Sequence, residues 1–462
     1  MWNFDLSQYD SVWALFIQIC LCLVFLLIGN TLRRKIPFLR KAFIPSALIG
    51  GFLLFLVNML AEKIFNFSLV NARTMQIITY HMLAIGFIAM SLKIINKGNE
   101  NKIKALKVFQ NGAITGGTYM LQAVVGIIVS LLFVAFGSSL FYDAGVLLPL
   151  GFGQGPGNAL IWDNNFTAAG LFDGEGTVGL TIASIGFIVA SICGVVYINF
   201  YKRKQEINHQ EEVIKHTIED YESEDEIEDS ESVDKTSIQI AFVFLAYLLA
   251  FGIMWLFAKI SEWTGIELFN NVAWGFNFIW GVITATLVKL IVKKLHNKKI
   301  MKRRYINNYQ MDRISGLSFD LMILAGVAAI DIDIVTKYIG FIIILAIVGS
   351  IVTFVYVKIM TKLCFKDFKH EAFLVNFGTL TGTASNGMIL LREVDSTYNT
   401  PANDVFILSQ FPAMLFVAPL LILLAFGSKS LTNCIISLII FFVLFAAYTL
   451  FLIISCKKEN RN

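Results

Sequence analysis

The stretch AGVLLPLGFGQGPGNALIWDN, residues 144–164, carries alternating glycines and a proline between two apolar flanks. Each glycine destabilises a helix interior by about 1 kcal/mol and a proline by about 3 kcal/mol, so the flanks cannot join as one helix. Irregular backbone at membrane depth is stable only where protein buries it or where it lines a wet cavity. We expect a re-entrant hairpin near 144–163 that enters from outside. An ordinary loop capping the preceding span is the alternative.

The surrounding sequence has the composition of a membrane protein. Of 462 residues, 56% are hydrophobic and 15% are charged, whereas soluble domains carry roughly 25% charged residues. A crossing helix needs about 20 mostly apolar residues. The segments that meet this need predict an all-α polytopic protein with about eleven crossings, at 11–30, 43–60, 76–93, 113–137, 177–201, 238–260, 271–292, 314–331, 338–360, 404–426 and 432–455. The net charge of +4 is modest and forms no basic stripe, so no nucleic-acid partner is expected.

Basic residues gather in alternate loops, and cytoplasmic loops are the ones enriched in lysine and arginine. They follow the first, third, fifth, seventh, ninth and last spans, as in Arg33–Lys35, Lys93–Lys107, Lys202–Lys204, Lys293–Arg304, Lys362–Lys369 and Lys457–Lys458. The other loops hold only Lys63, Arg73, Lys337 and Lys429. We therefore expect an N-terminus outside and a C-terminus in the cytosol.

Residues 205–236 are acidic and poor in apolar residues, which predicts a solvated cytosolic linker. It is either a flexible tether or a regulatory segment. On each side lie four spans, a glycine-rich interruption and one more span, so two five-helix repeats of opposite orientation are expected. The expected parts are a first repeat 1–204, the linker 205–236, a second repeat 237–427, and an extra span with a basic tail at 428–462.

The second interruption is EAFLVNFGTLTGTASNGMILLREVD, residues 371–395. It predicts a re-entrant hairpin near 370–393 that enters from the cytosol. Its hydroxyl and amide oxygens suit a sodium ion, and half-helix N-termini suit a carboxylate. A small-residue packing face would also favour glycine, serine and threonine.

The candidate site residues come from both interruptions and from nearby spans. For solute binding they are Gly153, Gln154, Gly155, Gly157, Asn158, Thr381, Gly382, Thr383 and Arg392. For ion binding they are Thr383, Ser385, Asn386, Asp320 and Gln410.

Several of these candidates have a plain alternative. Arg392 could pair with a carboxylate or extend to the interface beside Glu393. Asp320 could hold a cation or lie at the interface. Gln410 with Ser409, like Thr181 with Ser184, could form a polar helix face.

At LPLGFGQGPGNA (148–159) and FGTLTGTASNGMILLREVD (377–395) the chain resembles the bacterial glutamate–sodium symporter family. The resemblance implies a bacterial inner-membrane protein with sodium-coupled uptake of glutamate, inverted repeats and a dimeric scaffold. It implies no cofactor beyond sodium as the coupling ion, with a small anionic solute, the lipid bilayer and a second copy as partners. Arg392 with its acidic neighbours, the acidic linker and the extra last span depart from the family pattern. A charge near the site could favour another carboxylate, and the sequence leaves both sodium and proton coupling open.

Other function classes fit the sequence less well. An enzyme needs a nucleophile–base pair or a metal constellation in the spans, and His81, the one intramembrane histidine, has no evident partner. The six cysteines form no CxxC pair, so no zinc site is expected. A channel usually presents rings of groups from identical subunits. A membrane sensor that uses the acidic segment remains an alternative.

Overall fold

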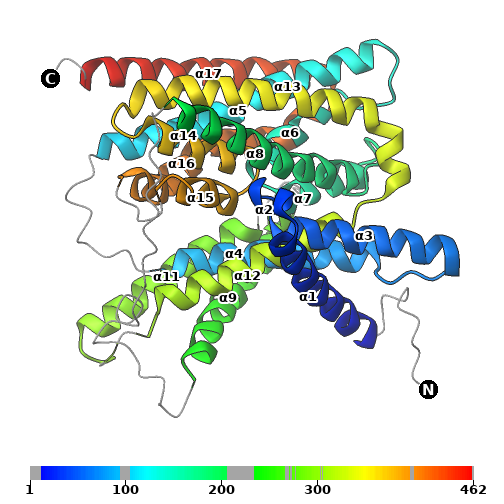
Figure 1. Cartoon of the computed structure of the whole chain (residues 1–462), viewed down its shortest axis with the longest axis horizontal. Helices are drawn as coiled ribbons and strands as arrows, with labels where there is room; N and C mark the ends of the chain where they lie inside the picture. The colour runs from blue at the N-terminus through cyan, green and yellow to red at the C-terminus, as the bar shows by residue number, and fades with distance from the viewer. Residues whose placement is uncertain are drawn as a thin grey trace. The chain divides into compact units, whose positions relative to one another are not determined.

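The computed structural model describes residues 12–93, 105–204, 234–265, 270, 273–275, 277–301, 303, 305–395 and 400–459. Within these ranges the regular elements are helices, and no strand is formed. In chain order (Figure 1) they are α1 (Val12–Lys35), α2 (Pro37–Lys41), α3 (Ser46–Phe65), α4 (Ala72–Leu92), α5 (Ala105–Ala135), η2 (Ala144–Val146), α6 (Leu147–Gly153), α7 (Pro156–Ala168), α8 (Thr177–Arg203), α9 (Lys235–Thr264), α11 (Asn277–Asn297), α12 (Asn308–Ala328), α13 (Ile332–Cys364), α14 (Lys369–Thr381), α15 (Ala384–Arg392), α16 (Ala402–Gly427) and α17 (Leu431–Glu459).

Eight of the described helices are long and apolar enough to cross a membrane: α1, α3, α4, α5, α8, α9, α13 and α17. Helix α16 would be a ninth, with a bend of 46° before Pro412. Helices α11 and α12 lie at two further predicted spans, but each carries three charged side chains, among them Lys289 in α11 and Asp320 in α12. The chain is therefore a polytopic helical membrane protein, and the number eleven stays a prediction.

The helices form two compact units, and each unit takes residues from both sides of the acidic segment. Unit 1 comprises 1–76, 98–212 and 324–462, and unit 2 comprises 77–97 and 213–323. Most of the predicted linker, 205–233, lies outside the described residues. Its last residues start α9, where the Asp234 carboxylate caps the helix by accepting the Ser237 N–H at 3.0 Å.

Helix α5 is the centre of unit 1, and it packs against α13, α16 and α17. Helices α5, α13 and α17 run side by side (Figure 1). Small residues allow this close approach, as is common where membrane helices pack. A Cβ on Gly126 would overlap the Gly145 carbonyl group, and one on Gly116 would overlap Phe416 of α16.

Unit 2 holds most of α4 together with α9, α11 and the first part of α12. An apolar core joins these helices through residues such as Ile88, Val243 and Val288. The Lys289 ammonium donates to the Ser91 carbonyl at 2.6 Å. Its charge is therefore held at a helix end rather than in the apolar core.

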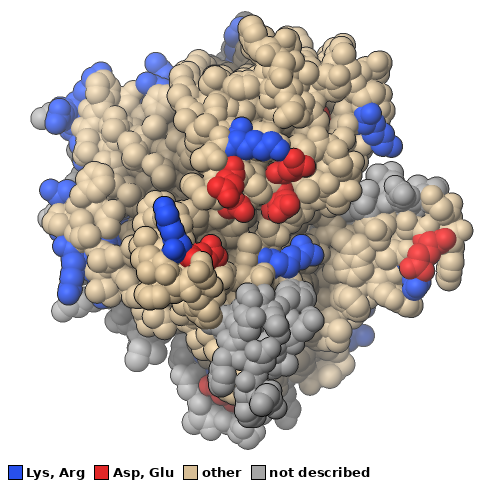
Figure 2. Space-filling model, turned by 90° about the vertical axis from the view of Figure 1, so that its right-hand side faces the viewer, with Lys and Arg blue, Asp and Glu red and all other residues tan. Residues whose placement is uncertain are grey.

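Acidic side chains gather beside a basic one on one face of the molecule (Figure 2). In unit 1 the exposed Asp173 and Asp333 flank the starts of α8 and α13, and Lys337 pairs with Asp173 at 2.7 Å. These loops are the ones that the lysine and arginine pattern assigns to the outside.

The close contact of α5 with η2 predicts that Gly126→Ala lowers stability. Overpacking of a tight interface costs about 1–3 kcal/mol, so we expect a lower thermal unfolding midpoint for the purified protein in detergent. Gly340→Ala is the matched control, because its Cβ would meet nothing nearer than the Phe133 ring at 3.8 Å. Equal midpoints for the two variants would contradict the close packing described here.

Candidate functional site

The first helix break lies between α6, which ends at Gly153, and α7, which begins at Pro156. Gly155 has φ +79°, a backbone conformation that glycine adopts without steric cost. Pro156 follows at the first helical position, where its missing N–H is not needed. The local sequence therefore ends one helix and starts the next within three residues.

A tyrosine of α5 holds this break in place. The Tyr119 hydroxyl donates to the Gly153 carbonyl oxygen at 2.6 Å. A Cβ on Gly153 would overlap the Tyr119 ring. Glycine at this position is thus required by the tyrosine that satisfies its carbonyl group.

The second break lies between α14, which ends at Thr381, and α15, which begins at Ala384. The two helices fold against each other, since a Cβ on Gly378 would lie 2.8 Å from the Gly387 Cα. Helix α5 supports this break as well. The Gln122 amide donates to the Leu380 carbonyl at 3.0 Å and to the Thr353 hydroxyl of α13 at 2.8 Å.

The two breaks touch each other inside unit 1. A Cβ on Gly155 would lie 3.2 Å from the Thr383 methyl carbon and 3.8 Å from the Gly382 carbonyl oxygen. Segments from the two sides of the acidic linker therefore meet where both lack regular helix.

Polar atoms at this meeting point have no hydrogen-bond partner within the described chain. They are Gln154 Oε1, Asn158 Oδ1, Thr383 Oγ1 and both amide atoms of Asn386. Buried polar groups are nearly always hydrogen-bonded, and each exception calls for an explanation. Four such side chains at one place make the meeting point of the breaks the candidate site for a polar ligand.

Helix ends add fixed partial charges to this cluster. Helices α7 and α15 direct their N-termini to the breaks, whereas α6 and α14 direct their C-termini there. Helix N-termini attract anions, and the carbonyl groups at C-termini attract cations. The breaks thus offer adjacent places for an anion and for a cation without using a charged side chain.

The structure brings together ten of the predicted site residues. The first break carries Gly153, Gln154, Gly155, Gly157 and Asn158, and the second carries Thr381, Gly382, Thr383, Ser385 and Asn386. The Thr381 hydroxyl donates to the Phe377 carbonyl at 2.7 Å, so it is engaged within its own helix.

Three predicted residues lie outside this cluster. Arg392 is exposed at the end of α15, about 13 Å along the helix from Thr383. Gln410 is exposed, and its amide donates to the Phe406 carbonyl of its own helix at 3.1 Å. Asp320 is half-buried in unit 2 and belongs to that unit alone.

The predicted pair Thr181 and Ser184 makes hydrogen bonds within its own helix. Each hydroxyl donates to the carbonyl four residues earlier, at 2.7 Å and 2.8 Å. Both side chains therefore satisfy their hydrogen bonds within α8.

Sequence reasoning missed the polar face of α5. Asn111, Tyr119 and Gln122 are all buried, and their spacing places them on one side of a helix. Asn111 donates to Ser409 of α16 at 2.7 Å and accepts from Asn376 of α14 at 2.8 Å. The sequence signal for this polar face is the presence of amide side chains inside an otherwise apolar span.

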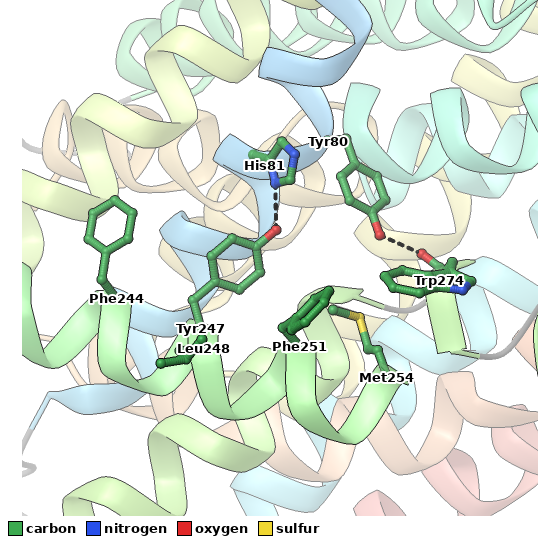
Figure 3. A pocket seen from close by; sticks show the side chains of 8 residues that line it. All are labelled: Tyr80, His81, Phe244, Tyr247, Leu248, Phe251, Met254 and Trp274. Atoms are coloured by element: carbon green, nitrogen blue, oxygen red, sulfur yellow. Dashed lines mark hydrogen bonds between the residues drawn. The ribbon is translucent and has the colours of Figure 1, made fainter. Parts of the chain in front are cut away.

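His81 does have a partner, contrary to the sequence expectation. Its Nδ1 lies 2.7 Å from the Tyr247 hydroxyl. In unit 2 both side chains line a cavity of about 350 Å³ with Trp274, whose carbonyl accepts from Tyr80 at 2.8 Å (Figure 3). The lining is mainly aromatic and apolar, and its Tyr80, His81 and Tyr247 polar groups already hydrogen-bond within the unit.

The comparisons with known proteins agree with the resemblance seen in the motifs. A family model described as sodium/glutamate symporter matches residues 14–400, which include both breaks. No individually curated protein matches the chain. Because the family model covers most of the sequence, the chain belongs to the sodium/glutamate symporter family, whose members are membrane transporters.

Proposed function

We propose that the protein couples the entry of sodium to the uptake of glutamate or a related anionic amino acid. The observation that carries this proposal is the group of unpartnered polar atoms at the two touching helix breaks. Family membership supports the same reaction class. The solute and the sodium ion are both cargo in this reaction.

The sodium ion is assigned to the second break. Thr383 Oγ1 and Asn386 Oδ1 are buried oxygens without a partner, and Ser385 lies between them in the sequence. Unwound backbone and half-helix C-termini supply carbonyl oxygens to sodium in known transporter architectures. A small cation that takes up these lone pairs satisfies groups that the chain itself leaves open.

The anionic solute is assigned to the N-termini of α7 and α15. Gly155, Gly157 and Gly382 keep side chains away from the backbone amides there, and Asn158 and Gln154 add polar side chains. Transfer of a lone carboxylate to a site of low dielectric constant is costly. A sodium ion bound beside it offsets that cost, which is the physical basis for coupling the two.

The architecture that we propose follows the two repeats, 1–204 and 237–427, with the linker and the last span outside them. Their helix pairs enter the bilayer from opposite faces as re-entrant hairpins, and alternating access exposes the site to each side in turn. The chain would work as a homodimer in a bacterial inner membrane, with its N-terminus outside and its C-terminus in the cytosol.

A second candidate is a sodium- or proton-coupled carrier of another carboxylate. The position of Arg392 outside the cluster supports this second candidate. Neutral amides and helix ends would bind a carboxylate group, but they would not distinguish glutamate from another solute that carries one. A channel would also place polar segments in the membrane, but it would show neither saturation nor exchange.

Transport in proteoliposomes tests the function directly. We expect saturable exchange of labelled glutamate and uptake that follows an inward sodium gradient. Asn386→Ala and Thr383→Ala should raise the sodium requirement roughly tenfold to a hundredfold, since a lost contact to a charge costs about 1.5–3 kcal/mol. Ser350→Ala is the control, because its hydroxyl donates to the Ala346 carbonyl of its own helix at 2.6 Å.

A panel of other amino acids and dicarboxylates in the same assay separates the two candidates. Uptake that ignores sodium and collapses with a protonophore would contradict the assigned coupling ion. Flux that never saturates would favour the channel.

Bulk at the breaks should abolish transport. Gly155→Val and Gly382→Val would each place a branched side chain where the two breaks meet, so we expect loss of uptake from protein that stays monodisperse. Gly252→Val is the control, since nothing lies within 4 Å of its Cβ position. Cysteines at 155 and 383 should crosslink, and the solute should slow the reaction; normal transport by both valine variants would refute the shared site.

The orientation can be tested at the two ends of α13, a helix about 50 Å long. Asp333 and Lys366 are both exposed. In a background without the six native cysteines, an impermeant maleimide on intact cells should label Asp333→Cys but not Lys366→Cys. Labelling at 366 would reverse the proposed topology.

A further inference from the structure

Asp143 is the last residue of the turn between α5 and η2 in unit 1. Its side chain is 1% exposed, and neither carboxyl oxygen has a hydrogen-bond partner. The function proposed above does not use this residue. A buried carboxyl group without a donor needs a separate explanation.

Two later helices meet Asp143 at this point. A Cβ on Gly427, at the end of α16, would overlap Asp143 Oδ2 and lie 3.0 Å from the Ser437 hydroxyl oxygen of α17. Ser437 is fully buried, and its hydroxyl also has no partner. Two oxygen atoms without partners, Asp143 Oδ2 and the Ser437 hydroxyl oxygen, therefore lie beside the same point of the Gly427 backbone.

The energetics exclude a bare charge at this place. Burying an isolated carboxylate in an apolar environment is far more costly than folding can offset, unless a cation accompanies it. Burial raises the pKa of the Asp143 carboxyl well above its usual range. A proton would neutralise the carboxylate charge, whereas a sodium ion would neutralise it and also bind the carboxylate and hydroxyl oxygens together.

We propose that Asp143 and Ser437 hold a sodium ion at the junction of the α5–η2 turn, α16 and α17. A monovalent cation balances the single carboxylate charge, and sodium takes oxygen ligands of this kind. Gly427 lets both side chains reach the same point of the α16 backbone.

This site is separate from the helix breaks. The whole of α6, seven residues long, lies between Asp143 and the first break. Gly427 and Ser437 come after residue 400, so they lie beyond the part that the family model matches. The ion would join a turn inside the matched part to the two final helices of the chain.

Saturation binding of radioactive sodium to the purified protein, without solute and at constant ionic strength in choline chloride, tests the site. We expect Asp143→Asn to bind one sodium ion fewer per chain than the wild type. Asp173→Asn is the control, because this exposed carboxylate pairs with Lys337 on the surface; it should bind the wild-type number.

Ser437→Ala gives an independent reading if Asp143→Asn fails to yield monodisperse protein. It keeps the charge and removes one oxygen, so it should weaken one component of sodium binding about tenfold or more. An unchanged number of bound sodium ions and an unchanged sodium affinity in both variants would overturn the proposal. So would the finding that Asp143 binds a proton but no sodium ion.

The same assay separates this site from the one at the breaks. Asn386→Ala should weaken one component of sodium binding and keep the component that Asp143→Asn removes. If the site at the breaks is wrong, Asn386→Ala binds sodium with the wild-type number and affinity while Asp143→Asn still loses one ion.

Discussion

A helix that stops inside an apolar environment leaves carbonyl and N–H groups open, and this cost decides how unit 1 is built. Helix α5 meets it with side chains rather than with water. Tyr119 donates to the carbonyl at the end of α6, and Gln122 donates to a carbonyl at the end of α14. The breaks are stable because a third, continuous helix completes their hydrogen bonding.

Helix α5 leaves several polar groups unsatisfied at the place where the breaks meet. Asn158, Thr383 and Asn386 keep polar atoms without partners there, while Tyr119 and Gln122 of α5 bond the carbonyl groups at the ends of α6 and α14. Of the polar groups at the two helix breaks, α5 thus bonds some and leaves others open. In the function proposed above, neutral groups and helix ends would bind an anion and a cation together, without a permanent charge that would favour one of them alone.

The breaks could be predicted closely from the sequence, because glycine and proline act on their own neighbours. The glycines and the proline predict an interruption within 144–163, and α6 and α7 separate at Gly155. The glycines of 370–393 predict a second one, and α14 ends just before Gly382. The anchors on α5 could not be predicted in the same way. Asn111 and Gln122 bind residues that are more than two hundred positions away, and no local pattern specifies such a contact.

Arg392 shows a second limit of sequence reasoning. It lies close to Asn386 in the chain, yet α15 continues without a break and carries its guanidinium group to the exposed end. Two residues that are close in the sequence can lie far apart in space when more than one helical turn separates them. The charged residues of α11 and α12 kept these two helices out of the group that is apolar enough to cross a membrane. Hydropathy counts a lysine in the same way whether its ammonium group is buried in an apolar core or donates to a helix end.

The position of α5 has a mechanical consequence. Its Tyr119 and Gln122 lie less than one turn apart, and each is bonded to a different break. Displacing one helix pair relative to the other would break hydrogen bonds in a region where water cannot replace them. Helix α5 therefore ties the two helix pairs together, and moving either pair away from α5 would break one of these two hydrogen bonds.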